Sequence, residues 1–301
     1  MNIVLAGGTG FLGRPLTESL VRAGHDVIVL TRGSSGSIAA GARAVTWDPN
    51  GNSGPWAAAI DGADAVVNLA GEPIAGKRWT AAHKQRILDS RVHATRSLAA
   101  AIGGAAAPPS VLVSGSAVGY YGPLGDEPVT EEHPAGSDFL GQVCRQWEQE
   151  ASRAASAHTR VTCVRTGIVL EKDGGALPQM LPPFRFGAGG PVGSGRQYWP
   201  WIHRDDWVAL VQWAIAAPAA TAAINATAPH PVTSREFANA LGRAMHRPAL
   251  MPAPAFALRL LLGEMADALL LSGQNAVPAK ATRAGFEFRY QDVDAALRAI
   301  L

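Results

Sequence analysis

The sequence predicts an α/β fold, with a doubly wound parallel sheet and a smaller C-terminal lobe. Three observations predict it. Short apolar runs alternate with helical patterns through the first two-thirds of the chain, several of these runs are apolar throughout, and a glycine-rich turn follows the first of them. Strands covered by helices on both faces of a sheet are apolar on both faces, so continuous runs of Val, Ile and Leu fit a parallel sheet.

Hydrophobic periodicity places the individual elements. We expect strands at residues 3–6, 26–30, 65–69, 110–114 and 160–165, with one more at 223–226. We expect helices at residues 14–23, 80–102, 139–157 and 205–216, and an amphipathic helix at 255–271. The stretch 174–200 is rich in Gly and Pro and predicts a long loop over a ligand site. We therefore assign residues 1–170, joined by 202–228, to the sheet domain, and residues 171–201 and 229–301 to a substrate-binding lobe.

Composition and charge indicate a soluble protein with a small-molecule partner. Of the 301 residues 48% are hydrophobic and 17% charged, and the formal net charge is +2. Without a run of one charge, this balance predicts neither nucleic acid nor a membrane as a partner. The start of the chain lacks the features of a secretion signal, and Cys144 and Cys163 are the two cysteines. We expect a cytoplasmic monomer or homodimer without a disulfide scaffold or a metal site.

The turn after the first strand has the spacing of a dinucleotide-binding loop. A GxGxxG pattern comes directly after a predicted strand and opens a predicted helix. The chain must turn sharply, let a pyrophosphate approach bare backbone and pack the helix on the sheet, and each step needs a missing Cβ. Free N–H groups at the helix start then face the phosphates. The turn predicts a Rossmann-type domain with cofactor contacts at Gly7, Thr9, Gly10, Phe11, Leu12 and Gly13.

The end of the second strand decides between the two nicotinamide cofactors. An NAD-binding domain offers Asp or Glu here to the ribose hydroxyls, whereas this chain has Arg32. A guanidinium can hold a 2′-phosphate with two hydrogen bonds, and Thr31 or Ser34 can add a hydroxyl. The sequence therefore predicts NADP, although an exposed arginine at a strand end is the plain alternative.

Small residues follow the strand at 65–69. This strand runs into Ala70 and Gly71, at the edge of the sheet where strands end and ligands bind. Small side chains let a cofactor lie against the backbone, so Ala70 and Gly71 are further candidate contacts.

At this point the sequence resembles the extended and atypical short-chain dehydrogenases/reductases of the NAD-dependent epimerase/dehydratase type. The matching segments, in order, are Gly7–Gly13, Asn68–Gly71, Ser114–Ala117, Tyr120–Gly122, Val164–Gly167 and Trp201–Asp206. More narrowly, it looks like the "epimerase family protein" branch, whose features here are Lys77–Thr80, Ser90–Arg91, Gly189–Gly195, Gly263–Met265 and Gly285–Phe286. In that branch the resemblance implies NADP contacts at Thr31, Arg32, Leu69, Ala70 and Arg91.

The resemblance also implies catalysis by Ser, Tyr and Lys, with Tyr and Lys four residues apart on one helix face. A lysine lowers the pKa of the neighbouring phenol, which is otherwise near 10. Ser116 stands in the place of the serine, but Leu140 and Cys144 stand where the tyrosine and lysine belong. Tyr120 or Tyr121 could supply a phenol from the loop after Ser116, so Ser116 and Tyr121 are the candidate catalytic residues.

A last polar cluster follows the aromatic residues Tyr198, Trp199 and Trp201. His203 is the histidine best placed for proton transfer, whereas Asp205 or Asp206 could cap the next helix. Two functions stay open. One is an NADP-dependent oxidoreductase or epimerase for a small polar or sugar-like substrate, and the other is a noncatalytic NADP(H)-binding redox sensor or regulatory protein.

Overall fold

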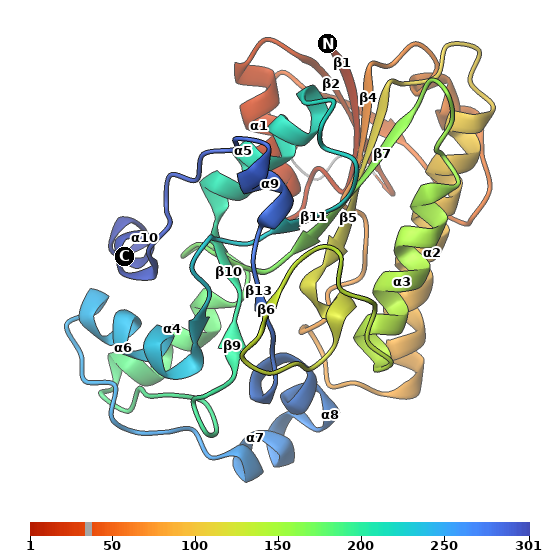
Figure 1. Cartoon of the computed structure of the whole chain (residues 1–301). Helices are drawn as coiled ribbons and strands as arrows, with labels where there is room; N and C mark the ends of the chain where they lie inside the picture. The colour runs from red at the N-terminus through yellow and green to blue at the C-terminus, as the bar shows by residue number, and fades with distance from the viewer. Residues whose placement is uncertain (34–37) are drawn as a thin grey trace.

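A seven-stranded parallel sheet forms the centre of the molecule (Figure 1). The structure is a computed structural model and describes residues 1–33 and 38–301. The strands lie in the order β11-β7-β5-β4-β1-β2-β3. Their bounds are β1 Asn2–Ala6, β2 Asp26–Thr31, β3 Arg43–Thr46, β4 Ala65–Asn68, β5 Val111–Ala117, β7 Arg160–Thr166 and β11 Ala222–Ala226. The order reverses between β1 and β4, and at such a switch point the carboxyl ends of the strands leave a crevice for ligands.

Four helices cover the two faces of this sheet: α1 Gly13–Arg22, α2 Ala81–Gly103, α3 Phe139–Ser152 and α5 Arg204–Ala216. In β1, Ile3 and Leu5 pack with α1 and α5, whereas Val4 and Ala6 pack with α2 and α3. Successive side chains of a strand point to opposite faces, so both faces of β1 are apolar and buried. The predicted doubly wound fold is therefore confirmed.

The predicted strands and helices of the sheet domain all exist, with ends shifted by a few residues. The strand expected at 223–226 is β11, which pairs in parallel with β7. Side chains fix several helix starts, because Thr80 accepts a hydrogen bond from the His83 N–H at α2 and Asp138 accepts one from the Gly141 N–H at α3. β3 was not predicted; its burial is low, as expected for an edge strand with few apolar residues.

The C-terminal lobe packs three further helices around an apolar cluster of its own. These are α4 Leu177–Arg185, α6 Ser234–Ala244 and α10 Val293–Ile300. The prediction of an irregular loop at 174–200 was wrong, because α4 forms there. Leu177, Leu181 and Phe184 recur at helical spacing and are buried in the lobe, which outweighs the prolines of this segment.

The other α-helices and strands are short. They are α7 Ala255–Leu262, α8 Glu264–Ala266, α9 Ala279–Arg283, and the short strands β6 Pro128–Val129, β8 Ile168–Leu170, β9 Tyr198–Trp199, β10 Trp201–His203, β12 Val232–Thr233 and β13 Asn275–Ala276. The single helix expected at 255–271 is broken at Gly263, whose φ of +64° is not helical. Ala281 and Phe288 pack with the sheet core although the predicted division places them in the lobe. No helix within residues 1–33 and 38–301 is long and apolar enough to cross a membrane.

Candidate active site

The glycine turn between β1 and α1 keeps its shape because three of its positions, Gly7, Gly8 and Gly13, have no room for a side chain. Gly7 has a φ of +84°, and a Cβ there would lie 2.7 Å from the carbonyl carbon of Leu69. A Cβ on Gly13 would overlap the carbonyl oxygen of Gly7. Gly10 is different, since its nearest atom is the Gly7 oxygen at 3.4 Å. A ligand can therefore approach the backbone closely at Gly10.

The start of α1 fits an anion. Phe11 and Leu12 lie between Gly10 and the helix and pack on the sheet core, which fixes the direction of the N–H groups in this turn. No side chain among the described residues caps the N-terminus of α1. Unpaired N–H groups and the positive end of the helix dipole favour a phosphate here. Thr9, between Gly8 and Gly10, is exposed at the same turn.

The carboxyl end of β2 lies beside the glycine turn. The register of the sheet pairs Ala6 with Leu30, so Thr31 and Arg32 follow at the same edge. The Thr31 hydroxyl donates to the carbonyl oxygen of Gly33 over 2.8 Å, and Arg32 is exposed. Ser34, the other predicted hydroxyl, lies outside the described residues.

The carboxyl end of β4 brings the next predicted contacts to this edge. Asn68 orients the chain after the strand, because its Oδ1 accepts from the Ala70 N–H at 3.2 Å. Leu69 lies against the glycine turn, where its N–H donates to the carbonyl oxygen of Ala6 at 2.8 Å. A Cβ on Gly71 would lie 3.1 Å from the guanidinium carbon of Arg91. Four predicted contacts, Leu69, Ala70, Gly71 and Arg91, are therefore close together in space.

Backbone carbonyl oxygens, rather than a carboxylate, hold the guanidinium of Arg91. Its Nη1 donates to the carbonyl oxygens of Glu72 at 3.0 Å and Ile87 at 3.1 Å, and its guanidinium lies 5.1 Å from the centre of the Trp147 ring. Burial lowers the pKa of the Arg91 guanidinium from its ordinary value. A guanidinium held by carbonyl oxygens keeps its charge available for an anionic ligand.

The end of β5 carries Ser116, and its hydroxyl has a charged partner. The Ser116 Oγ donates to Oε1 of Glu148 on α3 over 2.7 Å. Glu148 is in turn held by Arg165 of β7, whose Nε donates to Oε1 at 2.8 Å and whose Nη2 donates to Oε2 at 2.9 Å. The Arg165 side chain is 5% exposed and that of Glu148 14%. Water screens this pair far less than a surface pair.

Tyr121 belongs to the same network on its buried side. The Tyr121 OH accepts from Nη1 of Arg165 at 3.0 Å and donates its proton to Oδ1 of Asn225 at 2.6 Å. The residue is 2% exposed, and burial raises the pKa of its phenol to about 12. The role of Tyr121 as a proton donor stays a prediction, and this environment argues against it. Its hydroxyl already has a donor and an acceptor inside the protein.

One face of α3 points toward Ser116. Leu140, Cys144 and Glu148 are spaced by four residues, so they lie along this face. A Cβ on Gly119 would lie 3.2 Å from the Cβ of Leu140, which places Leu140 against the loop after β5. Burial, followed by the Glu148 charge, raises the pKa of the Cys144 thiol to about 12. Glu148 is therefore the residue of this face that holds a charge next to Ser116.

The second polar cluster has a structural arrangement. His203 caps α5, because its Nδ1 accepts from the Asp205 N–H at 3.0 Å, and its ring stacks on Tyr290 at 4.0 Å. Burial lowers the pKa of His203. The prediction that Asp205 or Asp206 caps this helix was wrong. His203 occupies the capping position, and both aspartates lie inside the first turn of α5. Asp206 instead accepts from the N–H groups of Arg289 and Tyr290 and so ties the C-terminal segment to α5.

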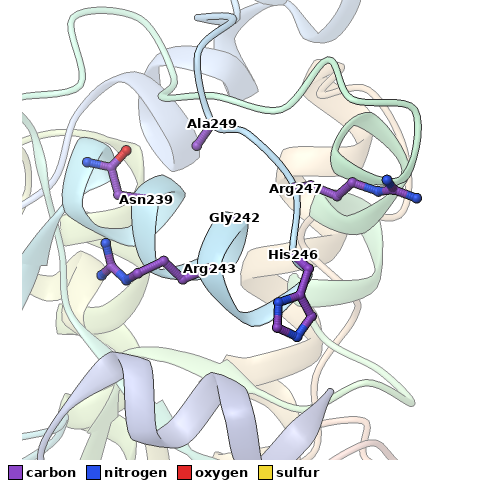
Figure 2. A pocket seen from close by; sticks show the side chains of 6 residues that line it. All are labelled: Asn239, Gly242, Arg243, His246, Arg247 and Ala249. Carbon is purple, nitrogen blue, oxygen red and sulfur yellow. The ribbon is translucent and has the colours of Figure 1, made fainter.

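Two cavities lie away from Ser116. One of ≈ 500 Å³ at the end of α6 is lined by Asn239, Gly242, Arg243, His246, Arg247 and Ala249 (Figure 2). Figure 2 shows Arg243, His246 and Arg247 pointing in different directions, so they do not converge on one ligand. Arg243 and Arg247 lie near the C-terminus of α6, where a positive charge interacts favourably with the helix dipole, and this explains both arginines without a ligand. The described residues contain no cluster of His, Cys, Asp and Glu that could hold a metal ion.

The second cavity, of ≈ 480 Å³, lies where α2 and α3 begin, at the same edge of the sheet as the glycine turn. Trp79, Leu88 and Phe139 form its apolar wall. Lys84 and Glu264 form an ion pair of 2.7 Å across it, between α2 and the C-terminal segment. Its polar and apolar walls therefore come from both parts of the chain.

Sequence reasoning missed Glu148, Arg165 and Asn225 as parts of this site. Arg165 was visible as a charged residue that directly follows Cys163 and Val164 near the end of a strand of the central sheet. A charged side chain in such a strand needs a buried partner, and this signal could have led to Glu148.

Comparison with known proteins agrees with this geometry. The NAD dependent epimerase/dehydratase family matches residues 3–226, and a domain of unknown function (DUF1731) matches residues 253–300. The chain is 43% identical over 304 residues to the chloroplastic epimerase family protein SDR39U1 homolog of Arabidopsis thaliana, covering 100% of this chain and 87% of that protein.

Solved structures show the same relationship. The crystal structure of human epimerase family protein SDR39U1 (isoform 2) with NADPH is 36% identical, with a TM-score of 0.91, and the match covers 100% of this chain and 99% of that one. A nucleoside-diphosphate sugar epimerase from Corynebacterium glutamicum is 34% identical with a TM-score of 0.80, covering 99% of this chain and 57% of that one. The predicted resemblance is confirmed, and the chain belongs to the NAD-dependent epimerase/dehydratase family.

Proposed function

We propose that this protein is an NADP(H)-dependent oxidoreductase or epimerase that acts on a small polar or sugar-like substrate between the sheet domain and the C-terminal lobe. The observation that carries the proposal is the hydrogen bond of 2.7 Å between Ser116 and Glu148. It places a hydroxyl with a charged partner at the edge of the sheet that also carries the glycine turn. The unpaired, buried Cys144 and Cys163 support the cytoplasm as its compartment.

The residues at the glycine turn fit a dinucleotide. The open side of Gly10 and the uncapped start of α1 would hold its pyrophosphate. Arg32 and Thr31 would hold the 2′-phosphate. The nicotinamide ring and its ribose would contact Leu69, Ala70, Gly71 and Arg91. The human relative was crystallised with NADPH, which supports the same cofactor here. When bound, NADP supplies a hydride acceptor or donor at its nicotinamide ring.

Ser116 and Glu148 would move the proton. Because the Ser116 proton is donated to Glu148, the free lone pairs of Oγ can accept a hydrogen bond from a substrate hydroxyl. As that hydroxyl loses its proton to Oγ, the proton of Ser116 passes to Glu148 Oε1. Arg165, through two hydrogen bonds, positions the carboxylate for this transfer. This route replaces the phenol that Leu140 cannot supply.

A second candidate function is a noncatalytic NADP(H)-binding sensor or regulator. The observation that favours it is the α3 face, where Leu140 has no titratable group and the buried thiol of Cys144 is held neutral. Ser116 and Glu148 would then be parts of the fold alone. The two candidates differ in whether bound NADPH is ever consumed.

Turnover separates the two candidates. The purified protein is incubated with NADPH and a panel of carbonyl compounds and nucleotide sugars, and absorbance at the nicotinamide band is followed together with product analysis for epimers. We expect Ser116→Ala and Glu148→Gln to lower turnover by about 100-fold or more, the usual share of a proton-transfer group. One matched control is Ser110→Ala, because Ser110 lies just before the start of the same strand β5 and its hydroxyl donates to the Asp64 carbonyl oxygen. The other is Glu150→Gln, because Glu150 is on α3 with Glu148 but pairs with Arg96 of α2. Tight NADPH binding without turnover of any compound would favour the sensor.

Cofactor preference tests the assignment of NADP. We expect Arg32→Gln to weaken NADPH binding by about 10- to 100-fold and to leave NADH binding unchanged, because a charged hydrogen bond contributes roughly 1.5–3 kcal/mol. Arg43→Gln is the control, since Arg43 is exposed at the opposite end of the neighbouring strand β3. Equal affinity of the Arg32→Gln variant and the natural protein for NADPH would contradict the assignment.

A further inference from the structure

The connection between β8 and α4 lies directly on the glycine turn. A Cβ on Gly174 would overlap the ring of Phe11, and one on Gly175 would lie 2.9 Å from Cε1 of the same ring. Gly175 also has a φ of +71°, a conformation that other residues rarely adopt. The two glycines therefore let this connection rest on Phe11.

Arg204 holds the connection in this position. It is the first residue of α5, and its Nη2 pairs with Oε2 of Glu171 at 2.9 Å while its Nη1 pairs with Asp173. Its guanidinium lies 5.6 Å from the centre of the Phe11 ring. The side chains of Arg204 and Glu171 are 17% and 12% exposed, so solvent screens this pair only in part.

We propose that Arg204, Glu171, Asp173 and Gly174–Gly175, together called the Arg204 clasp, close over the bound cofactor and set the rate at which it leaves. This inference rests on the proposed placement of the pyrophosphate at the glycine turn. Phe11 lies in that turn, between the open Gly10 and the start of α1. With its ring fixed under the two glycines, the N–H groups of the turn stay oriented toward the phosphates.

The positive charge of Arg204 is balanced by the two carboxylates of the clasp. Two carboxylates pair with this guanidinium, so it adds no net positive charge for attracting a phosphate. Its effect would be mechanical, because the connection must lift off Phe11, and the Glu171 pair must break, before the turn can open. Loss of a partly buried charge pair acts mainly on dissociation rates.

Stopped-flow measurement of NADPH association and release tests the clasp. We expect Arg204→Gln to raise the dissociation rate by about tenfold with an association rate changed less than about twofold. Glu171→Gln, which keeps Arg204 and its contact with Asp173, should also raise the dissociation rate of NADPH. Arg243→Gln is the matched control, because it removes an arginine paired with a carboxylate at 2.7 Å in the C-terminal lobe, and it should change neither rate.

The outcomes separate this inference from the proposed cofactor site. If Gly13→Ala loses NADPH while both clasp variants release it at the natural rate, the clasp is wrong and the cofactor site stands. If Gly13→Ala binds NADPH normally, the placement at the glycine turn is wrong and the clasp with it. A slower association that depends on salt, without faster release, would show Arg204 as a direct phosphate contact and also overturn the clasp.

Discussion

The glycine turn and the end of β5 are built in opposite ways, although both lie at the carboxyl edge of one sheet. The turn is made by backbone within seven consecutive residues, and its shape depends on missing side chains at Gly7 and Gly13. The end of β5 is made by side chains from four separate segments, which meet only in the folded chain: Ser116, Glu148, Arg165 and Asn225. A local motif can therefore be read from spacing, whereas the second site had to be found in space.

The two regions also differ in what stabilises them. Steric exclusion maintains the turn, so a single methyl group is enough to disturb it. The network at β5 depends on hydrogen bonds to buried charges, where every member needs its partner. Substitutions in the two regions should therefore have different signatures in stability and in cofactor binding.

The largest effect is expected when Arg165 is replaced. Arg165→Leu removes the charged partner of the Glu148 carboxylate and the donor to the Tyr121 hydroxyl, and removing one partner of a buried pair costs about 3–5 kcal/mol. Denaturant-induced unfolding of the variant and of the natural protein measures the difference in free energy of unfolding. Arg14→Gln is the control, because the Arg14–Glu18 pair is exposed and should contribute less than about 1 kcal/mol.

A double variant sharpens this prediction. Replacing both partners of a buried pair by apolar residues can be close to neutral, so Arg165→Leu with Glu148→Leu should recover part of the lost free energy. An Arg165→Leu protein as stable as the natural chain would contradict the view that this network is tightly coupled.

A smaller loss of stability, with a specific loss of binding, is expected in the glycine turn. Gly13→Ala forces a Cβ into the Gly7 carbonyl oxygen, and such overpacking costs about 1–3 kcal/mol. Since the turn must shift, NADPH affinity should fall by about 10- to 100-fold, measured by fluorescence titration. Gly103→Ala is the matched control, because a Cβ at this position in α2 meets no atom within 4 Å. Equal NADPH affinity of the two alanine variants would show that the turn tolerates a side chain.

The smallest effect is expected at His203, which tests whether the cluster of His203, Asp205 and Asp206 is structural. Burial lowers the pKa of His203 in the folded protein, so its contribution to stability is present above the unfolded pKa of about 6.5 and is lost as pH falls. A protonated ring can no longer accept from the Asp205 N–H. Thermal melting between pH 7 and pH 5 should show a decline of less than about 1.4 kcal/mol per pH unit.

Replacing His203 by asparagine separates its role as a helix cap from the effect of its protonation. His203→Asn keeps an acceptor at the start of α5 but does not titrate, so this part of the pH dependence should vanish. His158→Asn is the control, because His158 is exposed. The same decline in His203→Asn as in the natural protein would assign the pH dependence to other groups.

The sheet and the resemblance were predictable from the sequence because both depend on local patterns. Buried parallel strands are apolar throughout, and the glycine spacing follows the first of them directly. β3 was not predicted because an edge strand buries few of its side chains and so has no apolar run. α4 was not predicted because glycine and proline dominate the surrounding sequence, although its buried residues Leu177, Leu181 and Phe184 recur at helical spacing.

The network at Ser116 was only half predictable. Ser116 was predicted from the family resemblance, but its partner Glu148 is 32 residues away and its anchor Arg165 a further 17. Nothing in the spacing of these residues shows that they meet. Tyr121 illustrates the same difficulty, since a tyrosine in a loop after the site gives no sign that its hydroxyl points inward to Asn225.

The last strand of the sheet has a consequence for the order in which the molecule forms. β11 pairs with β7, yet it follows β7 only after the chain has left the sheet to build α4, β9, β10 and α5. A ribosome that has made only the first 170 residues has therefore delivered a sheet whose β7 still exposes an open edge, prone to pairing with other chains. The nascent protein must wait for more than fifty further residues, roughly several seconds of synthesis, before its own chain covers that edge.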